Sequence, residues 1–227
     1  LDLYAITLLP TTVTDDEIAG VVKYFEREKG ATRNPTGSIQ NYFRYRNDIV
    51  TPKLDALDWT GVTGMSETFD ACLSLTSFPA LDLSGSTSLA YSWRGCSSMA
   101  SFGACTFSTE ADDDINFNES WRGCAALTTF PALNLSRGTS FRYSWYLCTG
   151  LTSFPDITFS THADDDIDFT SAWKSCTALT SFPALNLSRA TVLNQAWDGC
   201  TSLTSFPAVT FSTTASDNLD FGNAWNG

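Results

Sequence analysis

Short segments in which apolar and polar residues alternate recur along most of the chain. They are Leu81–Leu83, Cys105–Phe107, Leu133–Leu135, Ile157–Phe159, Leu185–Leu187 and Val209–Phe211. An alternation of period two over a few residues predicts a half-buried β-strand whose middle residue points outward. The predicted outward residues are Asp82, Thr106, Asn134, Thr158, Asn186 and Thr210.

An aromatic residue followed three positions later by cysteine marks each repeating unit. The pairs are Phe69 with Cys72, Trp93 with Cys96, Trp121 with Cys124, Trp145 with Cys148, Trp173 with Cys176, and Trp197 with Cys200. The aromatic residues are spaced by 24 and 28 residues in turn, up to Trp225. Self-similarity at such a period is typical of solenoids. We therefore predict a mainly β solenoid of about six alternating short and long coils over residues 54–227.

No single coil is able to bury its apolar face alone, so the coils are expected to stack. Stacking aligns equivalent residues into a structural ladder, which we expect to contain Trp93, Trp121, Trp145, Trp173, Trp197, Cys72, Cys96, Cys124, Cys148, Cys176 and Cys200. The segments around the tryptophans, such as 171–176, are predicted to return the chain as one helical or 3₁₀ turn. Neighbouring strands at ~4.8 Å would give a block roughly 29 Å long.

The motif aromatic-x-x-Cys-x-x-Leu-Thr-Ser-Phe-Pro resembles the BspA-like (Treponema-type) leucine-rich repeats. The opening coil, residues 57–69, is similar to a repeat of Mycoplasma and bacterial surface lipoproteins, and the Trp- and Phe-Pro-rich units resemble repeats in bacteriophage tail-fibre proteins. The resemblance covers about residues 54–227, and it implies a leucine-rich-repeat-like solenoid that binds surfaces. Tryptophan in place of the usual phenylalanine and the 28-residue coils depart from those families.

The first 53 residues do not show the repeat pattern. Residues 1–9 read as a strand, and the capping-box pattern Thr14-Asp-Asp-Glu17 precedes an amphipathic helix with Ile18, Val21, Val22 and Phe25 on one face. This strand–helix adaptor, residues 1–33, resembles the closing segment of concanavalin-like (laminin-G-like) lectin domains. Residues 34–53 are predicted to be a linker and a cap over the first coil. Both ends of the sequence are expected to be cut from a longer chain.

The formal net charge of −12 arises entirely after residue 53. Contacts to nucleic-acid phosphates need clustered Lys and Arg, so the charge argues against a nucleic-acid partner. No apolar run approaches the ~20 residues of a membrane-spanning helix, so we expect no membrane insertion.

The pattern of cysteines allows two interpretations. They are either disulfides or metal thiolates, or they are small apolar residues of the core, where free cysteine is often found. The sequence holds no Cys-x-x-Cys pair, and stacked parallel Cβ vectors fit disulfide geometry poorly. We therefore expect free, buried thiols.

Acidic turns occupy the long coils. Their candidate cation ligands are Asp112, Asp113, Asp114, Asp164, Asp165, Asp166 and Asp217. Clustered carboxylates suit Ca²⁺, but Asp and Asn also favour turns by bonding their own backbone. The spacing matches no EF-hand, so a solvated turn and a weak Ca²⁺ site both remain open. No other cofactor is expected.

Neither catalysis nor stacking on sugars is the role that the pattern of these residues favours. Two carboxylates at suitable distance hydrolyse glycosidic bonds, yet the acidic residues recur by pattern, whereas an active site is usually one irregular spot. The tryptophans sit at an invariant repeat position, which favours a core role over stacking on sugars. The outward strand residues are the better contact candidates.

The sequence therefore predicts a non-enzymatic recognition module of a bacteriophage tail fibre or similar virion appendage. The alternatives are a BspA-like adhesin of a bacterial surface and a polysaccharide-degrading tailspike-type enzyme. The expected partners are a host-cell surface glycan or protein, other tail or surface proteins, and further copies of the chain, since many fibres are trimers. The expected location is extracellular, on a virion tail or a cell surface.

Overall fold

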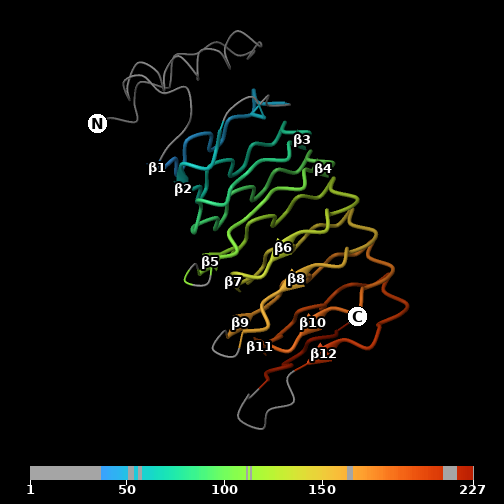
Figure 1. Cartoon of the computed structure of the whole chain (residues 1–227). Coiled ribbons are helices and arrows are strands. Elements are labelled where there is room, and N and C mark those ends of the chain that lie inside the picture. The colour runs from blue at the N-terminus through green and yellow to red at the C-terminus, as the bar shows by residue number, and fades with distance from the viewer. Residues whose placement is uncertain are drawn as a thin grey trace, which may run out of the picture.

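The computed structural model describes residues 37–50, 54–55, 58–110, 112, 114–162, 166–211 and 219–226. These residues form a mainly β, parallel solenoid of about seven turns, in which successive coils lie side by side from the N-terminal to the C-terminal end (Figure 1). The predicted strand–helix adaptor of residues 1–33 lies outside the described residues. Within the described ranges no helix is long and apolar enough to cross a membrane.

One parallel ladder runs along the whole stack. It contains β1 (Gly37–Ser38), β2 (Val62–Gly64), β5 (Ile115–Asn116), β7 (Gly138–Ser140), β9 (Ile167–Asp168) and β11 (Ala190–Val192). Isolated bridges from Gly64 to Ser88 and from Ser88 to Asn116 join β2 to β5, and Val192 bridges on to Asp220. Each coil therefore pairs in parallel with the next, with local register shifts in the pairs β1–β2, β5–β7 and β9–β11.

A second set of parallel pairs runs along the opposite side of the core. It contains β3 (Ser77–Phe78) with β4 (Ser101–Phe102), β6 (Asn134–Leu135) with β8 (Thr158–Phe159), and β10 (Asn186–Leu187) with β12 (Thr210–Phe211). We call the outward residues of segments 76–84, 100–108, 128–136, 152–160, 180–188 and 204–211 the strand face.

The segments around the aromatic ladder residues form the remaining side of each coil. We call the outward residues of these segments the turn face. These segments are 40–48, 66–74, 90–98, 118–126, 142–150, 170–178 and 194–202. Most of the basic residues after residue 36 lie on them, namely Arg44, Arg46, Arg94, Arg122, Arg142 and Lys174.

The predicted helical turns are not found in the described part of the chain. The residues two positions before and after each aromatic residue have positive φ, as for Glu119 at 55° and Gly123 at 74° around Trp121. Left-handed residues at this spacing break a right-handed helix. Alternate N–H groups instead point along the solenoid, so that Trp121 donates to the carbonyl of Ser144 in the next coil at 2.9 Å, while Arg122 closes a turn onto Glu119 at 3.2 Å.

Residues 37–50, predicted as part of a linker and cap, have the same backbone pattern. Asn41 and Tyr45 flank Phe43 with positive φ. The Phe43 N–H donates to Thr68 O at 2.8 Å, and its ring stacks on Phe69 with centroids 5.0 Å apart. This segment thus covers the coil of Phe69 by being a coil itself.

Three aromatic ladders fill the core between the two sides. Indole rings of successive coils stack at 5.1–5.6 Å and nearly parallel, from Trp93 to Trp225. The phenylalanines of the Phe-Pro motif stack in the same way and meet the indoles edge to face, as Phe130 meets Trp121 at 4.9 Å. A third ladder, Phe117, Phe141 and Phe169, stacks at 5.3 Å. Offset stacking and edge-to-face contacts are the favoured geometries for aromatic pairs.

The third ladder also shows how neighbouring residue sizes compensate. A Cβ added to Gly138 would lie 2.2 Å from Cζ of Phe141, so only glycine fits beside that ring. The equivalent residues of a later short coil are Ala190 and Leu193, both buried. Leu193 is smaller than the phenylalanine at the equivalent position, so it leaves room for the methyl group of Ala190.

We predict that Gly138→Ala destabilises the protein by about 1–3 kcal/mol, the usual range for overpacking a core. Phe141→Leu also destabilises it, because the stacking on Phe117 and Phe169 is lost. The double variant recreates the Ala190–Leu193 pair and should be more stable than the sum of the single effects. Urea unfolding measures all three free energies, and strict additivity would contradict this packing.

Candidate functional site

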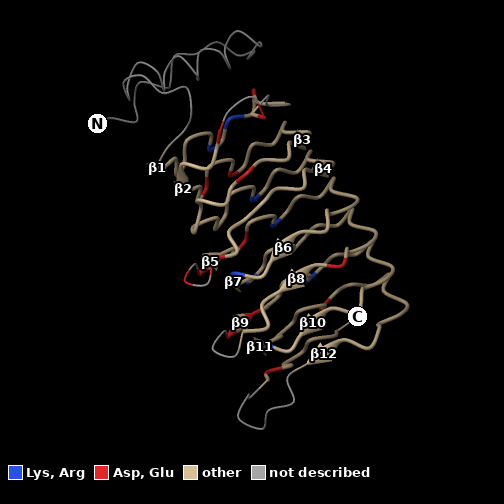
Figure 2. Ribbon diagram, viewed as in Figure 1, with Lys and Arg blue, Asp and Glu red and all other residues tan. Residues whose placement is uncertain are grey.

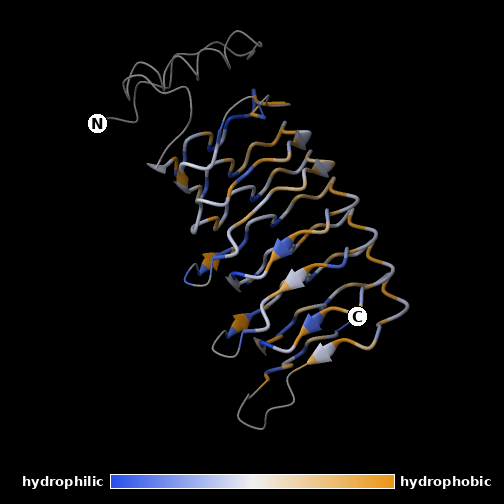
Figure 3. Cartoon of the chain, in the orientation of Figure 1, coloured by the Kyte–Doolittle hydropathy of each residue, from blue (hydrophilic) through white to orange (hydrophobic). Residues whose placement is uncertain are grey.

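The six outward strand residues all lie exposed on the strand face. The first five have buried apolar neighbours, whereas Val209 and Phe211, which flank Thr210, are partly buried. They pair in register, Asp82 with Thr106, Asn134 with Thr158, and Asn186 with Thr210. Strands β6 and β10 carry Asn at this position, whereas β8 and β12 carry Thr, an alternation that Figure 3 displays as blue and pale strands. The row is therefore a ladder of amide or carboxylate and hydroxyl groups with a period of two coils, ~10 Å.

The Asx members of this row are held by their own turns. The side-chain Oδ1 of Asp82, Asn134 and Asn186 each accepts the backbone N–H two residues later at 3.0 Å. In both asparagines this turn occupies Oδ1. The amide nitrogens of Asn134 and Asn186 have no partner among the described residues. Each of these donors is fixed in orientation before any ligand arrives, which lowers the entropic cost of binding.

Hydroxyl groups line the same face beside this row. Thr152 donates both its N–H and its Oγ1–H to Thr128 O at 3.1 Å, and Thr180 does the same to Thr152 O at 3.0 and 3.1 Å. The threonines therefore lock neighbouring coils together while their methyl groups remain on the surface.

Of the acidic turns, Asp114 and Asp166 directly precede β5 and β9, where Figure 2 shows acidic residues in red. Asp113, Asp164, Asp165 and Asp217 lie outside the described residues. Asp114 pairs with Arg137 at 3.8 Å, and the equivalent Asp166 pairs with Arg189 at 3.9 Å. No cluster of three or more metal-binding side chains occurs within the described ranges. An arginine of the next coil thus supplies part of the counter-charge, and the Ca²⁺ site stays a prediction.

The cysteine ladder is built into the backbone of the turn segments. All seven thiols are free and buried. Each ladder thiol donates to the carbonyl of the aromatic residue one coil earlier, as Cys148 does to Trp121 O at 3.2 Å. The same carbonyl accepts the N–H of Cys124 at 3.2 Å. Cysteine thereby joins two coils through one acceptor.

Burial controls the chemistry of these thiols. Desolvation raises the pKa of Cys72, Cys105 and Cys148 to about 12 and that of Cys200 to about 11, and it places the pKa of Cys96, Cys124 and Cys176 well above the usual range. The thiolate is the nucleophile and the metal ligand. We therefore expect the ladder thiols to be unreactive in the folded protein.

The tryptophan ladder is equally inaccessible. Five indole rings, from Trp93 to Trp197, are at most 2% exposed. Their Nε1–H groups have no hydrogen-bond partner among the described residues and lie among phenylalanine rings. Only Trp225, at 49% exposure, presents a substantial ring surface in this ladder.

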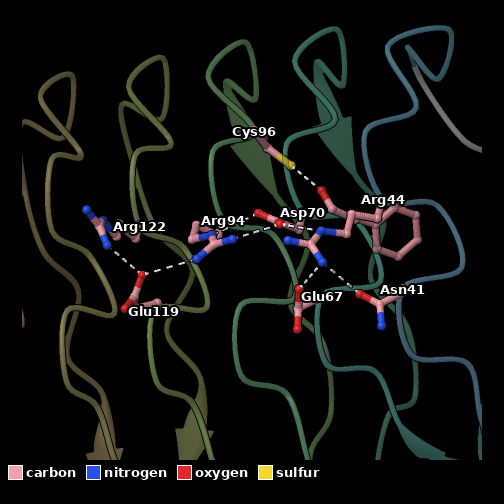
Figure 4. Close-up of polar contacts among 9 residues, drawn as sticks. Asn41, Arg44, Glu67, Asp70, Arg94, Cys96, Glu119 and Arg122 are labelled. Carbon is pink, nitrogen blue, oxygen red and sulfur yellow. Dashed lines mark hydrogen bonds and ion pairs between the residues drawn. The ribbon is translucent and has the colours of Figure 1, made fainter.

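An ion-pair ladder crosses the turn face, and the sequence pattern gave no sign of it. Asp70, whose side chain is 2% exposed, accepts from Nε of Arg44 and from Nε and Nη2 of Arg94, each at 2.9 Å. Glu119 then bridges Arg94 at 3.7 Å and Arg122 at 2.7 Å (Figure 4). Buried charges are tolerated when they are paired and hydrogen-bonded in this way.

Tyrosines accompany these arginines. The guanidinium groups of Arg44, Arg94 and Arg122 lie 4.7–5.0 Å from the ring centroids of Tyr45, Tyr91 and Tyr146. Equivalent residues are 24–28 positions apart in the sequence, so only the stacking of coils brings the ladder together. The turn face is thus the second candidate recognition surface.

No protein-family model, curated protein or solved structure matches this chain. The geometry described above and the sequence resemblance are therefore the basis of the proposals below.

We predict that none of the seven cysteines of the native chain reacts with a thiol reagent just below 9.0, the pKa of an unperturbed thiol, because every thiol is buried and protonated. All should react in concentrated guanidinium. Rapid labelling of any ladder cysteine in the native state, located by peptide mass spectrometry, would contradict the buried ladder.

The raised thiol pKa values also predict alkaline destabilisation. The Cys148 thiol of the folded state titrates at about 12 against 9.0 for an unperturbed group, so the unfolded state loses its proton first. Stability is complete below pH 9 and is lost as the pH rises toward 12, by up to about 1.4 kcal/mol per pH unit for each thiol. Urea midpoints between these values should fall less steeply for Cys148→Ala than for the parent chain. Equal slopes would contradict the prediction. Tyrosine titration affects both proteins equally, so it does not change the difference between their slopes.

Proposed function

We propose that this solenoid is a non-enzymatic recognition module that holds a host-cell surface glycan or protein against its strand face. The observation that carries the proposal is the row of exposed polar groups, in which Asp82, Asn134 and Asn186 are fixed by their own turns. A rigid row of donors and acceptors along ~24 Å, five coil spacings, suits an extended ligand rather than a small molecule.

The context we propose is a bacteriophage tail fibre or similar virion appendage, located outside the cell. The support is the resemblance of the repeat to tail-fibre units, together with its BspA-like, leucine-rich-repeat-like motif. A bacterial surface adhesin is the alternative, supported by the similarity of residues 57–69 to surface-lipoprotein repeats. Both contexts use the same contact surface.

The strand-face proposal predicts that Thr158→Lys lowers binding of the fluorescently labelled chain to bacterial cells at least about tenfold, because a long cation interrupts the middle of the row. A panel of Gram-negative and Gram-positive cells serves as the probe, and bound fluorescence is the measurement. Thr87→Lys is the matched control, since Thr87 is an exposed threonine that belongs to neither the strand face nor the turn face.

Both variants should melt within a few degrees of the parent chain. Periodate treatment of the cells removes binding if the ligand is a glycan, and protease treatment removes it if the ligand is a protein. Equal loss in both lysine variants, or no binding to any cell of the panel, would overturn the proposal.

A further inference from the structure

Two large side chains on the turn face occupy positions where the backbone favours glycine. Tyr45 and Leu147 have φ of 62°, at the position two residues after the aromatic residue that Gly95, Gly123 and Gly199 fill in other coils. Left-handed φ is unfavourable for a residue with a Cβ, and more so for a bulky one. Tyr45 is 61% exposed and Leu147 37%. The fold itself does not require either side chain.

The surroundings of these residues have the composition of an interface. Tyr91 and Tyr146 lie half-exposed beside Arg94 and Arg122, and the half-exposed Tyr143 packs edge to face on Tyr146. Tyrosine and arginine are enriched at protein–protein interfaces and dominate their energetics. The arginines are already oriented by Asp70 and Glu119, so their planes are fixed before a partner arrives.

The charge of this face differs from that of the rest of the protein. The chain carries −12 overall, yet on the turn face basic groups pair with Glu67, Asp70 and Glu119 in the ion-pair ladder and with Asp198 in a separate pair. Two copies of an acidic protein repel each other through most of their surfaces, and a balanced face is where they approach with least repulsion.

The order of residues along this face is self-complementary when it is reversed about the coil of Trp121. In the row directly after the aromatic residues, reversal sets Arg44 opposite Asp198 and Arg94 opposite Tyr146. In the left-handed row it sets Tyr45 opposite Gly199 and Leu147 opposite Gly95. Opposite charges, a cation and an aromatic ring, and large against small residues therefore coincide in one register.

We propose that two copies of this chain pair turn face to turn face, with antiparallel solenoids and a two-fold axis at the coil of Trp121. This is an isologous interface, in which each contact occurs twice. At the axis, Arg122 of one copy meets Arg122 of the other, and each guanidinium keeps the carboxylate of Glu119 of its own chain as counter-charge at 2.7 Å. Leu147 and Tyr45 fill the space above the glycines of the facing coils.

The test begins with sedimentation equilibrium of the chain over a wide concentration range, where a monomer–dimer equilibrium is expected. Leu147→Gly should raise the dissociation constant at least about tenfold, because it removes a central apolar contact. Its melting temperature should stay near that of the parent, since glycine is the residue the backbone favours there. Thr158→Lys on the strand face is the control and should leave the dissociation constant unchanged.

A cross-linking experiment fixes the orientation. Arg122→Cys lies on the axis and should form a disulfide-linked dimer on mild oxidation, while the native thiols stay buried. Lys174→Cys, in the same row but two coils away, places the two new thiols about 19 Å apart in an antiparallel pair and should not cross-link. A chain that stays monomeric or forms a trimer, a dissociation constant indifferent to Leu147→Gly, or equal cross-linking of both cysteine variants would overturn the proposal.

Discussion

Each coil of the solenoid depends on the coils beside it for its hydrogen-bond partners and for the burial of its apolar side chains. The backbone N–H of Trp121 donates to the carbonyl of Ser144, and its ring stacks between Trp93 and Trp145. Its carbonyl accepts the thiol of Cys148. A single coil would leave these groups unpaired and its apolar side chains in water. The stability of such a stack is therefore approximately a sum over neighbouring interfaces.

This constraint divides the residues of each coil into two sets. Inward positions must match the coil above and below, as Gly138 matches the ring of Phe141. Outward positions are less constrained: some pair across coils, as Asp70 does with Arg94, and the others are available for contacts with other molecules. The strand face uses that freedom regularly, alternating Asx and Thr, whereas the turn face uses it irregularly, through Tyr45 and Leu147.

The alternation of Leu133, Asn134 and Leu135 was enough to predict a strand with a buried–exposed–buried pattern, and this is confirmed. The backbone of the turn segments was not predictable in the same way. Positive φ is usually signalled by glycine or asparagine, but Glu119, Tyr143 and Gln195 stand at those positions. The coil of Phe43 was predicted only as a linker and cap, because it lacks both the ladder cysteine and the Phe-Pro motif.

The sequence by itself determined that the chain is a repeating β solenoid, because the period of its apolar residues admits no other way to bury them. It also identified which residues of each strand point outward, since a strand alternates its two faces. Only the tertiary structure decided what those outward residues meet. Arg44, Asp70 and Arg94 lie 24–26 positions apart, and their ion pairs exist because hydrogen bonds between coils fix the register of one coil on the next.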